Sequence, residues 1–148
     1  MLGQIGITVS PVNPTRRYAM SENGKGGLYR SDDAGESWQL INEDKNLWQR
    51  PWYYMMLAAD PQDENGLIVL NVNAQKSYDG GKTFKTIPVH HGDTHDIWWN
   101  PKNPLNYIIG ADGGSEVPYN DSTTFAAVGL PTPPFYQLAA ANDFTSTL

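Results

Sequence analysis

The stretches 31–38 (SDDAGESW) and 77–84 (SYDGGKTF) are two copies of one octapeptide, and they decide the fold. Their shared pattern is Ser-x-Asp-x-Gly-x-Ser/Thr-aromatic. A third copy at 118–125 (PYNDSTTF) keeps the closing Thr-aromatic pair but lacks the first serine and the glycine. The copies start at residues 31, 77 and 118, a step of 46 and then of 41 residues. The residues that define them are Ser31, Asp33, Gly35 and Trp38, then Ser77, Asp79, Gly81 and Phe84, and in the third copy Asn120 and Phe125.

A second marker repeats in phase with the octapeptide. Proline-containing turns at 10–14 (SPVNP), 60–63 (DPQD) and 100–104 (NPKNP) each precede a short apolar stretch. Two markers at one period of about 40–45 residues are typical of β-propeller blades, each a four-stranded antiparallel sheet. The sequence therefore predicts an all-β fold, a partial β-propeller of about three four-stranded blades plus one extra strand.

The blades are expected at about residues 5–41, 52–87 and 94–128 of a single domain that spans residues 1–148. The extra strand, Phe135–Ala140, would begin a fourth blade. No segment has the periodicity of a helix. The expected strands are Ile5–Val9, Arg17–Ser21, Gly27–Ser31 and Trp38–Ile41, then Trp52–Ala59, Leu67–Val72, Ala74–Tyr78 and Phe84–Ile87, and last Thr94–Trp99, Tyr107–Ala111, Ser115–Tyr119 and Phe125–Val128.

The residue types of the octapeptide suit a tight turn between two antiparallel strands. The aspartate can accept hydrogen bonds from backbone N–H groups inside the turn. The glycine can adopt a backbone conformation that other residues resist, and the Ser/Thr hydroxyls can close further local bonds. The final Trp or Phe is expected to pack between neighbouring sheets. The motif is therefore interpreted as structural and not as a catalytic site.

The octapeptide resembles the Asp-box, or BNR repeat. The chain around it resembles the propellers of sortilin/Vps10-like proteins and of bacterial "glycosyl hydrolase, BNR repeat" proteins, in the stretches 27–33 (GLYRSDD), 50–54 (RPWYY), 91–96 (HGDTHD) and 110–114 (GADGG). The resemblance covers nearly the whole chain. It implies a propeller fold but little about function, because Asp-boxes occur in sialidases, xyloglucanase-like enzymes, sortilin-type receptors and photosystem assembly factors. It also implies an exported protein, periplasmic or extracellular, and no signal peptide is visible in the sequence.

The composition excludes several classes of partner. The chain of 148 residues carries 16 acidic and 10 basic side chains, a net charge of −6, so it lacks the basic face that nucleic-acid binding requires. There is no cysteine, which excludes disulfides and thiolate metal sites. The longest apolar run is too short to span a bilayer. No cofactor is expected.

The candidate site residues gather on one face of the expected propeller, opposite the octapeptide turns, because connections in an antiparallel sheet alternate between its two ends. Loops on a rigid scaffold are where function usually lies. All three histidines fall within residues 90–96, where two His and two carboxylates could hold a metal or supply acid/base groups. Loop-fixing hydrogen bonds are the favoured interpretation, and no metal site is predicted. The candidate ligand-binding residues are Trp48, Arg50, Trp52, His90, His91 and His95, and the candidate carboxylates are Asp93, Asp96 and Asp112.

The evidence for an enzyme is thin. Only Arg16, Arg17, Arg30 and Arg50 are available, without the arginine-bearing N-terminal motif of sialidases. A xyloglucanase-like enzyme would need two carboxylates across a cleft. The main hypothesis is a non-catalytic propeller segment that acts as a binding or self-assembly module, with a protein or carbohydrate ligand. The alternative is a fragment of a glycoside hydrolase that acts on polysaccharide.

The number of expected blades points to a further partner. Propellers close with four to eight blades, so three blades leave two open sides with apolar flanks. Such exposed patches are rare on soluble monomers. The expected partner is a second copy of the chain or the missing blades of a longer parent chain.

Overall fold

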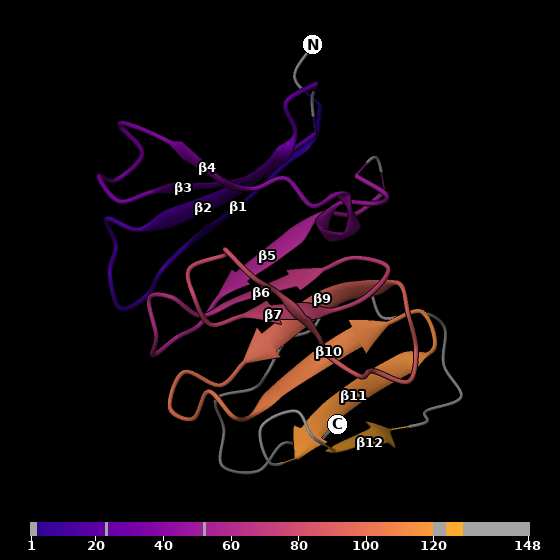
Figure 1. Ribbon diagram of the computed structural model, residues 1–148. Coiled ribbons are helices and arrows are strands. Elements are labelled where there is room, and N and C mark those ends of the chain that lie inside the picture. The colour runs from indigo at the N-terminus through magenta and orange to yellow at the C-terminus, as the bar shows by residue number, and fades with distance from the viewer. Residues whose placement is uncertain (1–2, 23, 52, 120–123, 129–148) are drawn as a thin grey trace.

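Three antiparallel meanders of short strands make up the fold, which the computed structural model describes for residues 3–22, 24–51, 53–119 and 124–128. They follow one another from the top to the bottom of Figure 1. Blade one comprises β1 (Ile5–Val9), β2 (Arg17–Ser21), β3 (Gly27–Ser31) and β4 (Gln39–Asn42). Blade two comprises β5 (Met56–Ala59), β6 (Leu67–Leu70), β7 (Gln75–Ser77) and β8 (Lys85–Thr86). Blade three comprises β9 (Thr94–Trp99), β10 (Tyr107–Ala111), β11 (Gly114–Tyr119) and β12 (Thr124–Val128).

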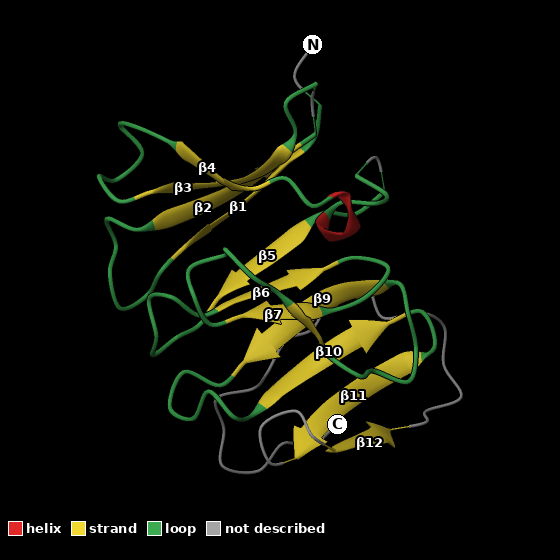
Figure 2. Ribbon diagram, in the orientation of Figure 1, coloured by secondary structure: helices red, strands yellow, loops and turns green. Residues whose placement is uncertain are grey.

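The all-β fold class and the partial propeller are confirmed. Each sheet has its four strands in sequence order, as a propeller blade requires. Strands and loops account for almost all of the described chain (Figure 2). The extra strand expected at Phe135–Ala140 lies outside the described residues, as do Asn120 and Trp52.

Two expectations about local structure are wrong. The strand expected from Trp52 begins only at Met56, because the amides of Tyr53 and Tyr54 both donate to the carbonyl of Arg50 and hold a turn there (3.0 and 3.1 Å). The described residues also include one 3-10 helix, Lys45–Leu47, where no helix was expected. The side chain of Asp44 caps this helix by accepting a hydrogen bond from the backbone N–H of Asn46 at 2.9 Å. Such a single turn is too short to have a helical sequence period.

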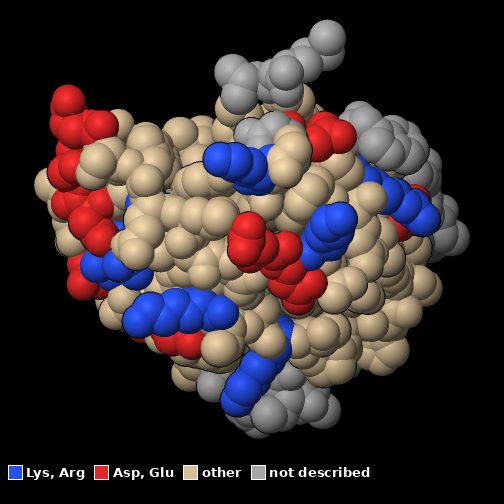
Figure 3. Space-filling view, turned by 45° about the horizontal axis from the view of Figure 1, so that its top comes forward, with Lys and Arg blue, Asp and Glu red and all other residues tan. Residues whose placement is uncertain are grey.

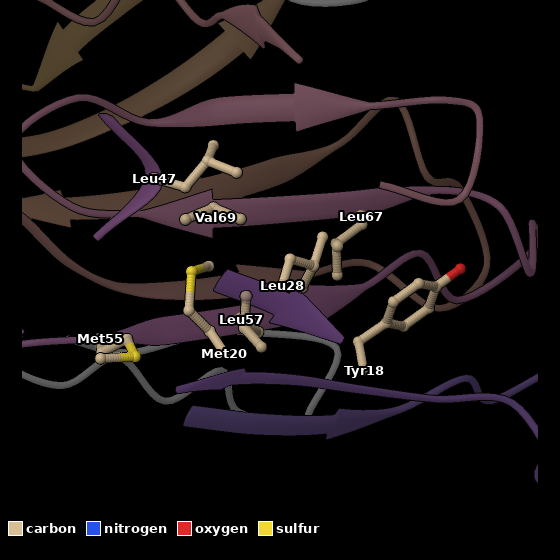
Figure 4. Packing of buried hydrophobic residues seen from close by; sticks show 8 residues of the cluster. All are labelled: Tyr18, Met20, Leu28, Leu47, Met55, Leu57, Leu67 and Val69. Atoms are coloured by element: carbon tan, nitrogen blue, oxygen red, sulfur yellow. The ribbon is translucent and has the colours of Figure 1, made fainter. Parts of the chain in front are cut away.

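Successive side chains of a strand point to opposite faces of its sheet, and one of these two sets forms the core between blades one and two. In β2, Tyr18 and Met20 point to blade two and are fully buried, whereas the residue between them points away. Gly6 lets β1 lie close to the backbone of blade two, because a Cβ at this position would be 2.6 Å from the carbonyl oxygen of Met55. Apolar burial of this kind contributes roughly 25 cal/mol per Å². Figure 4 shows the cluster, which consists of Tyr18, Met20, Leu28, Leu47, Met55, Leu57, Leu67 and Val69.

A second core joins blades two and three. It consists of Ile68, Leu70, Ala74, Ile87, Tyr107 and Ile109. The strand β6 supplies both cores, because all four of its residues are buried and successive side chains point to opposite blades. Lys76 is also buried on this side, with its ammonium 4.7 Å from the ring centre of Tyr78 and 5.3 Å from that of Trp99. These cation–π contacts offset part of the cost of burying its charge.

The octapeptide turns are closed by their own side chains. In the first, Asp33 accepts hydrogen bonds from the N–H and the hydroxyl of Ser37 and from the hydroxyl of Ser31 (2.9, 2.6 and 2.7 Å). The second repeats this geometry around Asp79. The glycines adopt left-handed backbone angles, φ 96° at Gly35 and 88° at Gly81, which only glycine adopts readily.

The aromatic residue that ends the octapeptide behaves differently in the two turns. Phe84 packs against the core between blades one and two. Trp38 was expected between sheets too, and that expectation is wrong, because its side chain is exposed and its Nε1 donates to the carbonyl of Gly35. The reason is that the described chain has no sheet on that side of blade one.

The meander order separates two faces of the propeller section. The β1–β2 and β3–β4 turns lie together on the left in Figure 1, and the 3-10 helix lies on the right. We call the first the turn face, since it carries the octapeptides. The second is the loop face, formed by the connections β2–β3, β4–β5, β6–β7, β8–β9 and β10–β11. The candidate site residues belong to this loop face.

Candidate functional site

Asp93 is the hub of the loop face. Its carboxylate accepts hydrogen bonds from the guanidinium of Arg50 at 2.9 Å and from the hydroxyl of Tyr54 at 2.5 Å. Its backbone N–H donates to the carbonyl of Val72, and its own carbonyl accepts from the N–H of Asp112 (3.0 and 3.2 Å). One residue therefore ties the β4–β5 loop to the β6–β7 and β10–β11 loops.

The backbone at Asp93 is strained. Its φ is +55°, in the left-handed region that non-glycine residues seldom occupy. Strain of this kind costs on the order of 1 kcal/mol or more, persists only where the surroundings impose it, and gathers at functional sites. Here the four contacts of Asp93 impose it.

Tyr54 stays protonated over a wide range of pH. Its burial raises the pKa of the phenol well above the usual 10.0, and the hydrogen bond to Asp93 raises it further. The hydroxyl is therefore a fixed donor to Asp93. It leaves the other carboxylate oxygen of Asp93 to Arg50, whose side chain is 45% exposed.

His95 and Asp112 form a pair beside this hub. The pairing of β9 with β10 shifts by one residue, so that Thr94 faces Ala111 and Asp96 faces Gly110, and His95 falls in the bulge between them. Bulges re-aim side chains in this way. His95 is buried, and its Nε2 lies 2.5 Å from a carboxylate oxygen of Asp112.

Two tyrosines complete the aromatic side of the cluster. The ring of His95 meets those of Tyr54 and Tyr53 edge to face, with centroids 5.0 and 5.7 Å apart. Tyr53 is 44% exposed, so one face of the cluster is an aromatic ring open to solvent. We call Arg50, Tyr53, Tyr54, Asp93, His95 and Asp112 the Asp93 cluster.

A hollow lies next to the cluster, on the loop face between blades one and two. Its volume is about 500 Å³, and Glu22, Lys45, Asn46, Trp48, Gln49 and Pro51 line it. The Trp48 ring lies against Gly26, where a Cβ would come within 2.7 Å of it. The indole Nε1 of Trp48 is buried without a hydrogen-bond partner among the described residues. Arg50 and Tyr53 follow Trp48 in the same loop, so the hollow and the Asp93 cluster adjoin.

His90 and His91 belong to a different contact. The backbone N–H groups of both donate to the carboxylate of Glu116 (2.5 and 3.0 Å), and the His90 ring lies 3.2 Å from it. Glu116 is fully buried on β11, on the side that faces blade two. It fixes the β8–β9 loop against blade three, which is the loop-fixing role favoured for this histidine-rich stretch.

The sequence-predicted residues thus divide into groups. Arg50, Asp93, His95 and Asp112 come together. Trp48 lines the adjoining hollow, whereas the carboxylate of Asp96 accepts a hydrogen bond from the next amide, that of Ile97. The sequence interpretation missed Tyr53, Tyr54 and Glu116. The only signal for the first two was their place in the RPWYY stretch.

Neither a metal site nor a membrane span is found in the part of the chain that the structure describes. No group of three or more His, Cys, Asp or Glu side chains there could hold a metal ion. Within the same ranges no helix has the length and apolarity that a membrane span requires.

Comparison with known proteins gives the fold. No protein family and no curated protein matches the chain. Solved structures do match: an ancestral GH74 enzyme (TM-score 0.69, 18% identity, 89% of this chain) and the GH74 enzyme of Niastella koreensis (0.67, 15%, 89%). YCF48 from Cyanidioschyzon merolae matches as well (0.56, 18%, 86%).

The matches cover only part of those proteins. The chain spans 19% and 23% of the two GH74 chains and 36% of the YCF48 chain. At such low sequence identity the likeness establishes the architecture alone. The chain has the fold of a section of a β-propeller.

Proposed function

We propose that this chain is a non-catalytic section of an Asp-box β-propeller whose loop face binds a carbohydrate. The observation that carries the proposal is the exposed ring of Tyr53, which meets Tyr54 and His95 edge to face in a cluster that also holds the Arg50–Asp93 pair. A sugar ring has an apolar face that packs on an aromatic ring and hydroxyl groups that need paired donors and acceptors. The Asp93 cluster offers both on a rigid base.

The adjoining hollow extends the proposed site. A groove lined by an aromatic ring and a few polar side chains is typical of small-ligand sites. Trp48 supplies the ring, and Lys45, Asn46 and Gln49 supply the polar groups. A chain of sugar units could therefore run from the hollow across Tyr53 to Asp112, which favours a polysaccharide over a single sugar.

Two other features support the proposal at the level of resemblance. The structural neighbours include a GH74 xyloglucanase from Xanthomonas campestris (TM-score 0.62, 19% identity, 85% of this chain and 21% of that chain). The octapeptides resemble those of sortilin-like and bacterial glycosyl hydrolase propellers. Both resemblances favour an exported protein that meets polysaccharide outside the cytoplasm.

The test is calorimetric titration of the chain with xyloglucan oligosaccharides and other β-glucan oligosaccharides. Replacement of Tyr53 by Ala removes the stacking surface and is expected to weaken binding about tenfold, equivalent to about 1.4 kcal/mol. Tyr78→Ala is the matched control, because Tyr78 is 51% exposed and lies in an octapeptide turn on the turn face. No binding by the unaltered chain, or an equal loss in both variants, would contradict the proposal.

A fragment of a glycoside hydrolase is the second candidate. The Asp93 cluster contains two carboxylates, Asp93 and Asp112, and glycoside hydrolysis uses a pair of them. However, both carboxylate oxygens of Asp93 already accept hydrogen bonds, one from Arg50 and one from Tyr54. Release of reducing ends from xyloglucan by the chain, abolished in Asp112→Asn, would favour this candidate. We expect no such release.

A further inference from the structure

The outer face of blade one carries an apolar surface that the described chain leaves uncovered. In β1, Ile5, Ile7 and Val9 point away from blade two and are large, exposed side chains; Ile7 is 61% exposed. The strand register places Ala19 opposite Ile7, Tyr29 opposite Ala19, and Leu40 opposite Tyr29, all on this same side. In Figure 3, where blade one is turned toward the viewer, broad uncharged surface separates small groups of charged side chains.

The structure shows how such a face is covered in the next blade. In blade two, blade one covers the corresponding face, where Leu57 and Val69 pack into the core between blades one and two. By strand register, Leu57 and Val69 are opposite each other in blade two, as Ile7 and Ala19 are in blade one. The blade one surface is therefore built like a blade-receiving face.

The outer face of blade three offers the matching surface. Trp98 and Ile108 are opposite each other in the register of β9 and β10 and point away from the core that faces blade two. With Val117 they line a hollow of about 350 Å³. In blade three this surface has the same position that, in blade one, is occupied by the surface facing blade two.

We propose that the outer face of blade one binds the outer face of blade three of a second copy of this chain. The contact continues the blade-on-blade packing already present twice within the chain. Because the two surfaces differ, the contact is head to tail. Carbohydrate binding on the loop face plays no part in it.

The area of the contact favours a closed pair over an open filament. Four strands about 4.8 Å apart and about 3.3 Å per residue along a five-residue strand give each face a projected area of roughly 300 Å². One junction would bury roughly 600 Å² from both partners, below the about 1,200 Å² of stable complexes. Two junctions between the same two chains reach that value and give six blades, a number at which propellers close.

Directed crosslinking tests the pairing of the two faces. The natural chain has no cysteine, so chains carrying Ile7→Cys and Trp98→Cys can be mixed under mild oxidation without side reactions. We expect a crosslinked dimer between the two different variants and little crosslinking of either variant alone. Crosslinking of Ile7→Cys with itself would show a symmetric contact and overturn the head-to-tail proposal.

The mass in solution tests the assembly itself. Light scattering should give about twice the chain mass of 16.4 kDa at micromolar concentration. Ile7→Asp should shift the mass to that of one chain while leaving the β-sheet circular dichroism unchanged. Tyr78→Asp is the control, an exposed aromatic residue of blade two, and should leave the dimer intact. A monomeric unaltered chain, or dissociation by both variants alike, would overturn the proposal.

Discussion

The octapeptide turn of blade two gives the sharpest test of how local sequence stabilises this fold. Asp79 accepts hydrogen bonds from the N–H of Thr83 (2.9 Å), from its hydroxyl (2.6 Å) and from the hydroxyl of Ser77 (2.9 Å). Asp79→Ala removes all three. Because the freed donors of Thr83 can bind water, each bond is worth about 0.5–1 kcal/mol net, and the expected loss is about 2 kcal/mol.

The acid titration of Asp79 gives a second view of the same hydrogen bonds. Desolvation raises its pKa, but the hydrogen bonds from Thr83 and Ser77 outweigh that effect and lower the pKa from 3.8 to about 2. This difference corresponds to about 2 kcal/mol once solvent screening is allowed for. Since the folded pKa is depressed, the stabilisation is present above about pH 4 and disappears as the pH falls toward 2.

The assay is thermal unfolding of both proteins between pH 7 and pH 2. At pH 7 the variant should melt about 4–8 °C lower, and the gap should close as the pH approaches 2. Asp79→Asn, which keeps one acceptor oxygen, should lose about half as much. Asn120→Ala should cost less than Asp79→Ala, because that octapeptide lacks the glycine and the first serine. A gap below 0.5 kcal/mol at pH 7, or one that persists at pH 2, would refute the reasoning.

Two further outcomes follow from the loop face. Tyr54→Phe removes the donor to Asp93 and should lower stability by about 1 kcal/mol at pH 7; because burial and the hydrogen bond to Asp93 raise the pKa of Tyr54 in the folded state, its contribution should fade above about pH 10, seen as converging melting curves. Chelation with EDTA should leave the melting temperature unchanged, since the rings of His90 and His95 lie against carboxylates of the chain, and a stoichiometric metal by elemental analysis would contradict this.

The strands were predictable because each is specified locally. Alternating apolar residues and a repeated turn sequence mark where a strand begins and ends, and no distant contact is needed. The errors arose where a contact that the apolar pattern does not encode decides the backbone. Tyr53 and Tyr54 lie in an apolar run that is typical of a strand, but local hydrogen bonds to the carbonyl of Arg50 hold them in a turn, and a distant one joins Tyr54 to Asp93. Trp38 has the sequence of a packed aromatic residue, but its side chain is exposed, since the described chain has no sheet on that side of blade one.

The site residues were predictable only as a set of loops on one face. Their partners depend on how neighbouring blades meet: Glu116 on β11 holds the β8–β9 loop, and Arg50 reaches Asp93 across 43 positions of sequence. No spacing rule within one segment encodes such pairs. The sequence places His90, His91 and His95 in one short segment. In the structure the backbone N–H groups of the first two donate to Glu116, whereas the ring of His95 lies against Asp112.

The turn face and the loop face of the section differ in how regularly their contacts repeat from blade to blade. On the turn face, the octapeptides repeat the same bonds around Asp33 and Asp79, and each side chain satisfies its own turn. On the loop face, the repeat breaks down: Asp93 is held at a positive φ and His95 is set in a bulge. Departures from local preference persist only where other contacts impose them, and they gather where a protein does something besides fold. The loop face is therefore where a ligand should be sought, whichever chain covers the outer face of blade one.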